Sequence, residues 1–160
     1  MADERVDDER VDGDRGTAAE GHRIVVGVDG SASSKSALAW AARQAALTGA
    51  SLEVVAAWGY PVYFGTTPVW PSDFDPQSIT EQSVAEAVGE LRSAYPGLEV
   101  HTTVEETDAS VALLEAAEGA DLLVVGSRGH GAFTGMLLGS VSQHCVTHAH
   151  CPVVVVRDGK

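Results

Sequence analysis

Residues 24–31 read Ile-Val-Val-Gly-Val-Asp-Gly-Ser. A short continuous apolar run that stops at Asp-Gly-Ser is typical of a buried strand followed by a turn. Ser31 or Ser33 can then cap a helix, which Gly49 ends. The apolar positions that recur at helical spacing between these limits are Ala37, Leu38, Trp40, Ala41, Ala45 and Leu47.

The same alternation of strand and helix continues along the chain. Further strand-like runs are 52–58, 98–105, 122–125 and 153–156, and helical segments are predicted at 78–95, 108–118 and 140–148. In the second of these helices Asp108 is the expected cap, with Val111, Leu114 and Ala117 on one face. Right-handed crossovers place helices on both faces of a parallel sheet. The sequence therefore predicts an α/β fold with a doubly wound, five-stranded parallel sheet.

Length and charge limit the possible functions. A chain of 160 residues with 44% hydrophobic content suits one domain, which we place at residues 23–158. The formal net charge is −13, and residues 1–22 hold eight acidic residues against three arginines. This segment contains the repeated pentapeptide Asp-Glu-Arg-Val-Asp and predicts a disordered acidic tail. Without a basic field, the chain is not expected to bind nucleic acid.

Neither a leader nor a membrane span is predicted. No apolar leader follows Met1, and no apolar run approaches the roughly 20 residues needed to cross a bilayer. The expected location is cytoplasmic, with no membrane insertion. In that compartment Cys145 and Cys151 are expected to be reduced thiols rather than a disulfide.

A glycine-rich segment follows the run at 122–125. Residues 126–139 contain five glycines and lead into a predicted helix. Glycine lets backbone amides approach a ligand closely, and a helix start adds unpaired N–H groups and a positive dipole end. Ser140 and Ser142 can add hydroxyl donors, and Arg128 can add positive charge. This pattern favours a phosphate-binding loop at the carboxyl edge of the sheet.

The spacing Gly126-x2-Gly129-x9-Gly139-Ser140 resembles the ATP-binding signature of the universal stress protein family. Other blocks resemble the same family and cover residues 23–157 in order. They are residues 24–31, Ala-Ala-Trp at 56–58, Val-Val-Gly-Ser-Arg-Gly at 124–129, and His-Ala-His-Cys-Pro-Val-Val-Val-Val at 148–156. The resemblance implies a Rossmann-like fold of the adenine-nucleotide alpha-hydrolase-like type.

The resemblance also implies a set of binding residues. Asp29 is expected to contact the nucleoside, and the backbone near Ala56 and Ala57 to border the adenine. Gly126 and Gly129 are expected to border ribose and phosphate. The phosphate cradle implied is Gly139, Ser140, Val141 and Ser142, and the remaining binding residues implied are Gly27, Ser127, Arg128 and Leu138.

The resemblance implies that the protein is an ATP-binding regulator or sensor in stress response. Mg²⁺ or Mn²⁺ would then be held mainly by the phosphates. It also implies a homodimer that pairs the last strands, here residues 153–156, with a further protein partner left open. Catalytic residues and protein ligands for a metal are not assigned.

Other readings of the sequence stay open. His130 lies in the glycine-rich loop, so slow ATP hydrolysis is one alternative, and a nucleotide-free dimeric scaffold is another. His144 and His148 are four residues apart on a predicted helix and can share a face that binds zinc. Trp40 fits the core, whereas the aromatic residues of 58–70 can cover the adenine or pack across a dimer.

Overall fold

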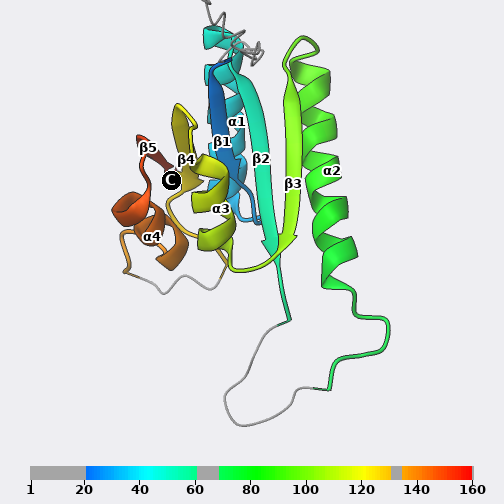
Figure 1. Ribbon diagram of the computed structural model, residues 1–160. Coiled ribbons are helices and arrows are strands. Elements are labelled where there is room, and N and C mark those ends of the chain that lie inside the picture. The colour runs from blue at the N-terminus through cyan, green and yellow to red at the C-terminus, as the bar shows by residue number, and fades with distance from the viewer. Residues whose placement is uncertain (1–20, 61–68, 131–134, 160) are drawn as a thin grey trace, which may run out of the picture.

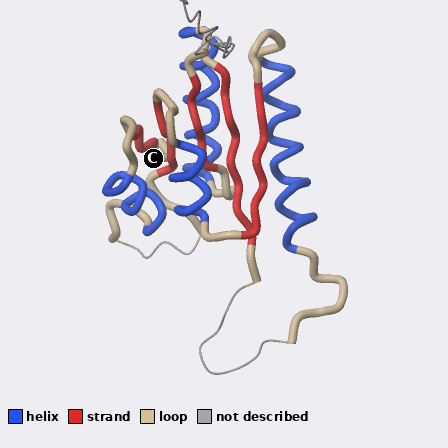
Figure 2. The backbone as a smooth tube through the Cα atoms, viewed as in Figure 1, coloured by secondary structure: helices blue, strands red, loops and turns tan. Residues whose placement is uncertain are grey.

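The computed structural model describes residues 21–60, 69–130 and 135–159. The predicted acidic tail therefore lies outside the described residues, apart from Gly21 and His22. The strands are β1 (Arg23–Gly27), β2 (Ser51–Trp58), β3 (Val100–Glu106), β4 (Leu122–Gly126) and β5 (Val153–Val156). The helices are α1 (Ala32–Thr48), α2 (Pro76–Ala94), α3 (Ala109–Ala117) and α4 (Ser140–His148). Figure 2 shows how strands and helices alternate along the backbone.

All five strands run parallel in one sheet, in the order β3-β2-β1-β4-β5. The chain builds outward from β1 to β3 and then returns to the other side of β1 with β4. The strand order therefore reverses between β1 and β4, and ligands of open α/β sheets bind at such a point. The predicted α/β fold with a single five-stranded parallel sheet is confirmed.

Helices cover both faces of the sheet, with α2 beside β3 and α3 and α4 on the opposite face (Figure 1). Alternate strand residues supply the two cores: Val26 and Val54 pack with α1 and α2, whereas Val25 and Val55 pack with α3. The near-continuous apolar runs of β1 and β4 follow from burial on both faces.

Side-chain caps determine where the first three helices begin. Ser31 accepts a hydrogen bond from the Ser34 amide, Asp75 from the Ser78 amide, and Asp108 from the Ser110 amide. Helix α1 ends at Gly49, whose φ of 72° lies in the left-handed region that glycine tolerates best. Because Asp75 is the cap, α2 begins two residues earlier than its predicted start at Ser78.

Two residues of the predicted apolar helix faces are exposed. Leu47 is 75% exposed, since it lies two residues beyond buried Ala45 and therefore about 200° around the helix. In α3 the buried stripe is Ala112, Leu113 and Ala117, so Val111 is 42% exposed. Within the described residues, no helix is long and apolar enough to cross a membrane.

Candidate functional site

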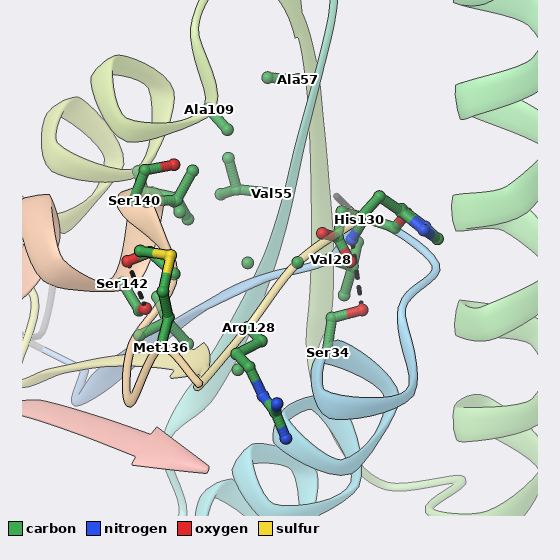
Figure 3. A pocket seen from close by; sticks show the side chains of 18 residues that line it. Val28, Ser34, Val55, Ala57, Ala109, Arg128, His130, Met136, Ser140 and Ser142 are labelled. Atoms are coloured by element: carbon green, nitrogen blue, oxygen red, sulfur yellow. Dashed lines mark hydrogen bonds between the residues drawn. The ribbon is translucent and has the colours of Figure 1, made fainter. Parts of the chain in front are cut away.

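A cavity of about 340 Å³ lies at the carboxyl ends of β1 and β4, where the strand order reverses. Its walls come from the β1–α1 turn, β2, the start of α3, the segment after β4 and the start of α4 (Figure 3). The volume falls in the range of small-molecule sites. Of the residues predicted to bind, those that line this cavity are Gly27, Asp29, Ala57, Gly126, Arg128, Gly129, Gly139, Ser140, Val141 and Ser142.

Three predicted binding residues do not line the cavity. Ala56 is 3% exposed and faces the core under α1 and α2, because successive strand side chains point to opposite faces and Ala57 takes the cavity side. Ser127 is 2% exposed, and its carbonyl accepts hydrogen bonds from the Gly139 amide and the Ser142 hydroxyl. Leu138 is half-buried outside the cavity lining.

Asp29 presents its carboxylate at the end of β1. Its Oδ1 accepts a hydrogen bond from the Ser31 amide at 2.9 Å. Desolvation by burial raises the pKa of this carboxyl, but hydrogen bonds from Ser31 and Ser34 and the charge of His130 outweigh it, so the pKa is lowered. The group is therefore ionised near neutral pH and can accept hydrogen bonds from ligand hydroxyls.

Two glycines allow close approaches that a side chain would block. A Cβ on Gly126 would lie 2.8 Å from the Ser33 carbonyl carbon and 2.8 Å from the Ser34 amide nitrogen. A Cβ on Gly129 would lie 2.7 Å from Asp29 Oδ2. Gly126 therefore lets β4 end against the first turn of α1, and Gly129 leaves room for the Asp29 carboxylate.

Hydrogen bonds join the segment after β4 to the β1–α1 turn. The Ser33 hydroxyl donates to the Arg128 carbonyl and accepts from the Arg128 amide at 3.4 Å. His130 Nε2 donates to the Asp29 carbonyl at 2.7 Å. The two walls of the cavity are therefore linked, and His130, which was not among the predicted binding residues, lines it.

Helix α4 meets the cavity with its N-terminus. Its N-cap is Gly139, and no side chain caps it, unlike α1, α2 and α3. The Ser142 hydroxyl shares its one hydrogen between the carbonyl oxygens of Ser127 and Gly139, at 3.1 and 3.0 Å, so in this structure it supports the loop. Ser140 is exposed and lines the cavity (Figure 3), so the start of α4, where helices have unpaired N–H groups, borders the cavity.

Positive charge at the site comes from Arg128. Its guanidinium is 46% exposed and lies 3.8 Å from the Asp158 carboxylate, a contact at the long limit of an ion pair. Exposed pairs of this kind contribute little. Arg128 can therefore turn toward an anionic ligand at small cost.

Most of the lining residues that were not predicted have apolar side chains. Val55 and Val125 alternate onto this face of the sheet, and Leu113 comes from α3. Strand alternation could have identified the two valines, but the face of α3 that packs on the sheet could not be read from a helix in which most residues are apolar. The other lining residues missed are Val28, Ser34, Ala109 and Met136.

The remaining candidates lie elsewhere. No group of three or more His, Cys, Asp or Glu residues is arranged to hold a metal ion in the part of the chain that the structure describes. Both cysteines are free, and desolvation by burial raises the pKa of the Cys145 thiol to about 11.

Trp40 is half-buried against the core. Trp58, Tyr60, Phe74 and Trp70 form a chain of ring contacts beyond β2, and residues 61–68 lie outside the described part.

Comparison with known proteins gives consistent matches. The model of the universal stress protein family matches residues 21–157. A universal stress protein of Mycolicibacterium smegmatis is 38% identical over 135 residues, which are 84% of this chain and 45% of that protein. The chain thus spans about half the length of the curated relatives that it matches.

Solved structures agree with this match. A universal stress protein in complex with cAMP is 28% identical, with a TM-score of 0.65, over 87% of this chain and 98% of that one. A universal stress protein of Archaeoglobus fulgidus in complex with dAMP shares the fold at 24% identity, with a TM-score of 0.60, over 84% and 97% of the two chains. The cavity thus lies at the carboxyl edge of a sheet whose fold these structures share, and the chain belongs to the universal stress protein family.

Proposed function

We propose that this protein binds ATP in the cavity at the carboxyl edge of the sheet and acts as a nucleotide-dependent regulator in the cytoplasmic stress response. The observation that carries the proposal is the convergence of the Asp29 carboxylate, the glycine-rich segment and the uncapped start of α4 on one cavity of about 340 Å³. The carboxylate can accept hydrogen bonds from the ribose hydroxyls, and the glycine-rich segment lets a nucleotide lie close to the backbone. The start of α4 can bind a chain of phosphates.

Each part of ATP has a wall of suitable chemistry. Val55, Ala57 and Val125 offer apolar surface to the base, and Asp29 can accept hydrogen bonds from the ribose. The phosphates would lie at the start of α4, near Ser140 and Arg128. Mg²⁺ or Mn²⁺ would be held mainly by phosphate oxygens, with few protein ligands.

The relative solved with cAMP supports an adenine nucleotide as the ligand class. It is 28% identical to this chain, and the match covers 98% of that relative's length. Retention of the nucleotide rather than rapid turnover is proposed because no carboxylate among the described residues accepts a hydrogen bond from the His130 ring to orient it as a base. Its Nε2 donates to the Asp29 backbone carbonyl instead, which leaves only Nδ1 of the neutral ring with a lone pair.

The test is to release and identify what the purified protein carries. Protein prepared without added nucleotide is denatured, and any nucleotide is identified by chromatography and mass spectrometry. The Asp29→Asn variant should lose most of the nucleotide. The control Asp121→Asn changes an exposed carboxylate at the amino ends of the strands, away from the cavity, and should keep the nucleotide. ADP in place of ATP would indicate turnover, and empty protein that also fails to bind added ATP, AMP or cAMP would leave only a scaffold role.

We also propose a homodimer through β5. This strand lies at the edge of the sheet, pairs with β4 on one side, and its four valines are half-buried. Exposed apolar edges favour pairing with another strand. Analytical ultracentrifugation should give twice the 16.6 kDa of one chain, and a Val155→Lys variant should shift toward the monomer. A parent protein that stays monomeric at high micromolar concentration would refute the dimer.

A further inference from the structure

Two histidine rings lie stacked on the exposed side of α4. The ring centroids of His144 and His148 are 4.2 Å apart, with an angle of 26° between the planes. The residues are one helical turn apart and both are exposed, and neither lines the nucleotide cavity. The pair is thus accessible from solvent and independent of the proposed function.

Within the described chain, the one hydrogen bond of the pair leaves ring nitrogens available. The Nδ1 of His148 lies 3.0 Å from the His144 carbonyl oxygen. A carbonyl can only accept, so Nδ1 carries the proton and Nε2 of the neutral ring keeps its lone pair. No hydrogen bond links the His144 ring to any other residue among those described. A donated Nδ1–H is the arrangement that orients metal-binding imidazoles in other proteins.

We propose that His144 and His148 together bind one late first-row divalent metal ion, with Cu²⁺ preferred over Ni²⁺ and Zn²⁺; the exposed rings turn out of the stack so that their in-plane lone pairs converge on the ion. Imidazole nitrogens suit these ions, whereas Mg²⁺ and Mn²⁺ favour oxygen ligands. No third His, Cys, Asp or Glu of the described chain joins the pair, so water completes the coordination. The preference for Cu²⁺ follows from the general order of divalent metal affinities.

The charge around the pair favours a cation. The pKa of Asp108 is lowered by hydrogen bonds from Ser110, and the charge of a protonated His144 lowers it further. Asp108 is therefore an ionised carboxylate within electrostatic range of His144, and it would stabilise a metal ion in the same way as the protonated ring. Bound metal would also clamp the last turn of α4, a helix of nine residues.

A residue exchange tests the geometry without changing the composition. In the double variant Gln143→His/His144→Gln the two histidines are five residues apart, so they lie about 140° apart around the helix and cannot chelate one ion. Gln143 is exposed, so the exchange should be tolerated. His150→Gln is the second control, because His150 is exposed and pairs with Glu118 instead.

The measurement is calorimetric titration of the untagged, full-length protein with CuCl₂, and then with NiCl₂, ZnCl₂ and MgCl₂. The parent should bind one equivalent of Cu²⁺, and Mg²⁺ should give no signal at this site. The exchange variant should lose about tenfold or more in Cu²⁺ affinity, whereas His150→Gln should match the parent. Unchanged thermal unfolding of the metal-free exchange variant would show that its fold is intact. Equal Cu²⁺ affinity in parent and exchange variant, or no stoichiometric site in the parent, would overturn the proposal.

Discussion

The carboxylate of Asp29 links stability to pH. Its pKa lies below the ordinary value of 3.8, because hydrogen bonds from Ser31 and Ser34 outweigh the effect of burial. A carboxyl whose pKa is lowered by folding contributes stability above its unfolded pKa, and this contribution is lost as pH falls through the folded pKa. The contribution is small, because the carboxylate is only partly desolvated and the residue as a whole remains exposed to solvent.

Asp29→Asn should therefore lower the free energy of unfolding at pH 7 by no more than about 1 kcal/mol, since a neutral acceptor replaces a charged one at Ser31. The gap between variant and parent should shrink as pH falls below 3.8. Urea denaturation at several pH values measures both effects. A gap that is the same at pH 7 and pH 3 would mean that the charge of Asp29 is not what stabilises the turn.

Gly126 and Gly129 should respond differently to alanine, although both belong to the same glycine pattern. At Gly126 the new Cβ meets the backbone of Ser33 and Ser34, which cannot move alone, so Gly126→Ala should destabilise the fold by about 1–3 kcal/mol. At Gly129 the Cβ meets the side-chain oxygen of Asp29, which can rotate away. Gly129→Ala should therefore leave stability nearly unchanged.

Paired measurements of stability and nucleotide affinity separate these two effects. Gly129→Ala should weaken adenine nucleotide binding while its urea midpoint stays near that of the parent. Loss of binding by Gly126→Ala alone would not identify a contact with ligand, because the fold itself is strained there. If Gly129→Ala binds as the parent does, the orientation of Asp29 is not critical for the ligand.

At the scale of helices, the C-terminal end of α1 and the middle of α2 allow a matched comparison of glycines. Gly49 ends α1 at a φ of 72°, and a Cβ there would meet nothing within 4 Å. Gly89 is exposed in the interior of α2, where a Cβ would also meet nothing. Backbone conformation is therefore the only difference that matters between these positions.

Gly49→Ala should destabilise the protein by about 1 kcal/mol, because alanine is strained in the left-handed region. Gly89→Ala should stabilise it by about 0.5–1 kcal/mol, because alanine favours the helix and restricts the unfolded chain. Denaturation midpoints of the two variants, with unchanged denaturant slopes, give the comparison. The same sign for both substitutions would contradict the assigned end of α1.

Elements were predictable from the sequence where pattern and caps agree. Helix 140–148 and strand 153–156 have the predicted limits, and Asp108 is the predicted cap of α3. The face of α3 was missed because nearly every residue of that helix is apolar, so only packing on the sheet selects Leu113 over Val111. The sequence likewise indicates the glycine-rich segment, but which of two adjacent alanines faces the cavity depends on how β2 is turned between the two helix layers, and this places Ala57 on the cavity side and Ala56 in the other core.

At the scale of the whole molecule, charge opposes the proposed ligand. The formal net charge is −13, and the site offers Arg128 and the start of α4 as its positive features. ATP is a polyanion, so it approaches through a repulsive long-range field before it meets these local attractions. Salt screens the long-range part first, because the Debye length falls from about 30 Å at 0.01 M to about 8 Å at 0.15 M.

The association rate constant for ATP should therefore rise severalfold as NaCl is raised from about 10 to about 150 mM, opposite to the behaviour of a basic nucleotide site. Stopped-flow measurements with a fluorescent ATP analogue give the rate, and the matching adenosine analogue is the control, since an uncharged ligand should show almost no salt dependence. Removal of residues 1–20, which takes away eight acidic residues and three arginines, should weaken the effect. A rate that falls with salt would mean that Arg128 and the α4 N-terminus dominate the field along the ligand's path, so that the acidic surface does not limit nucleotide capture.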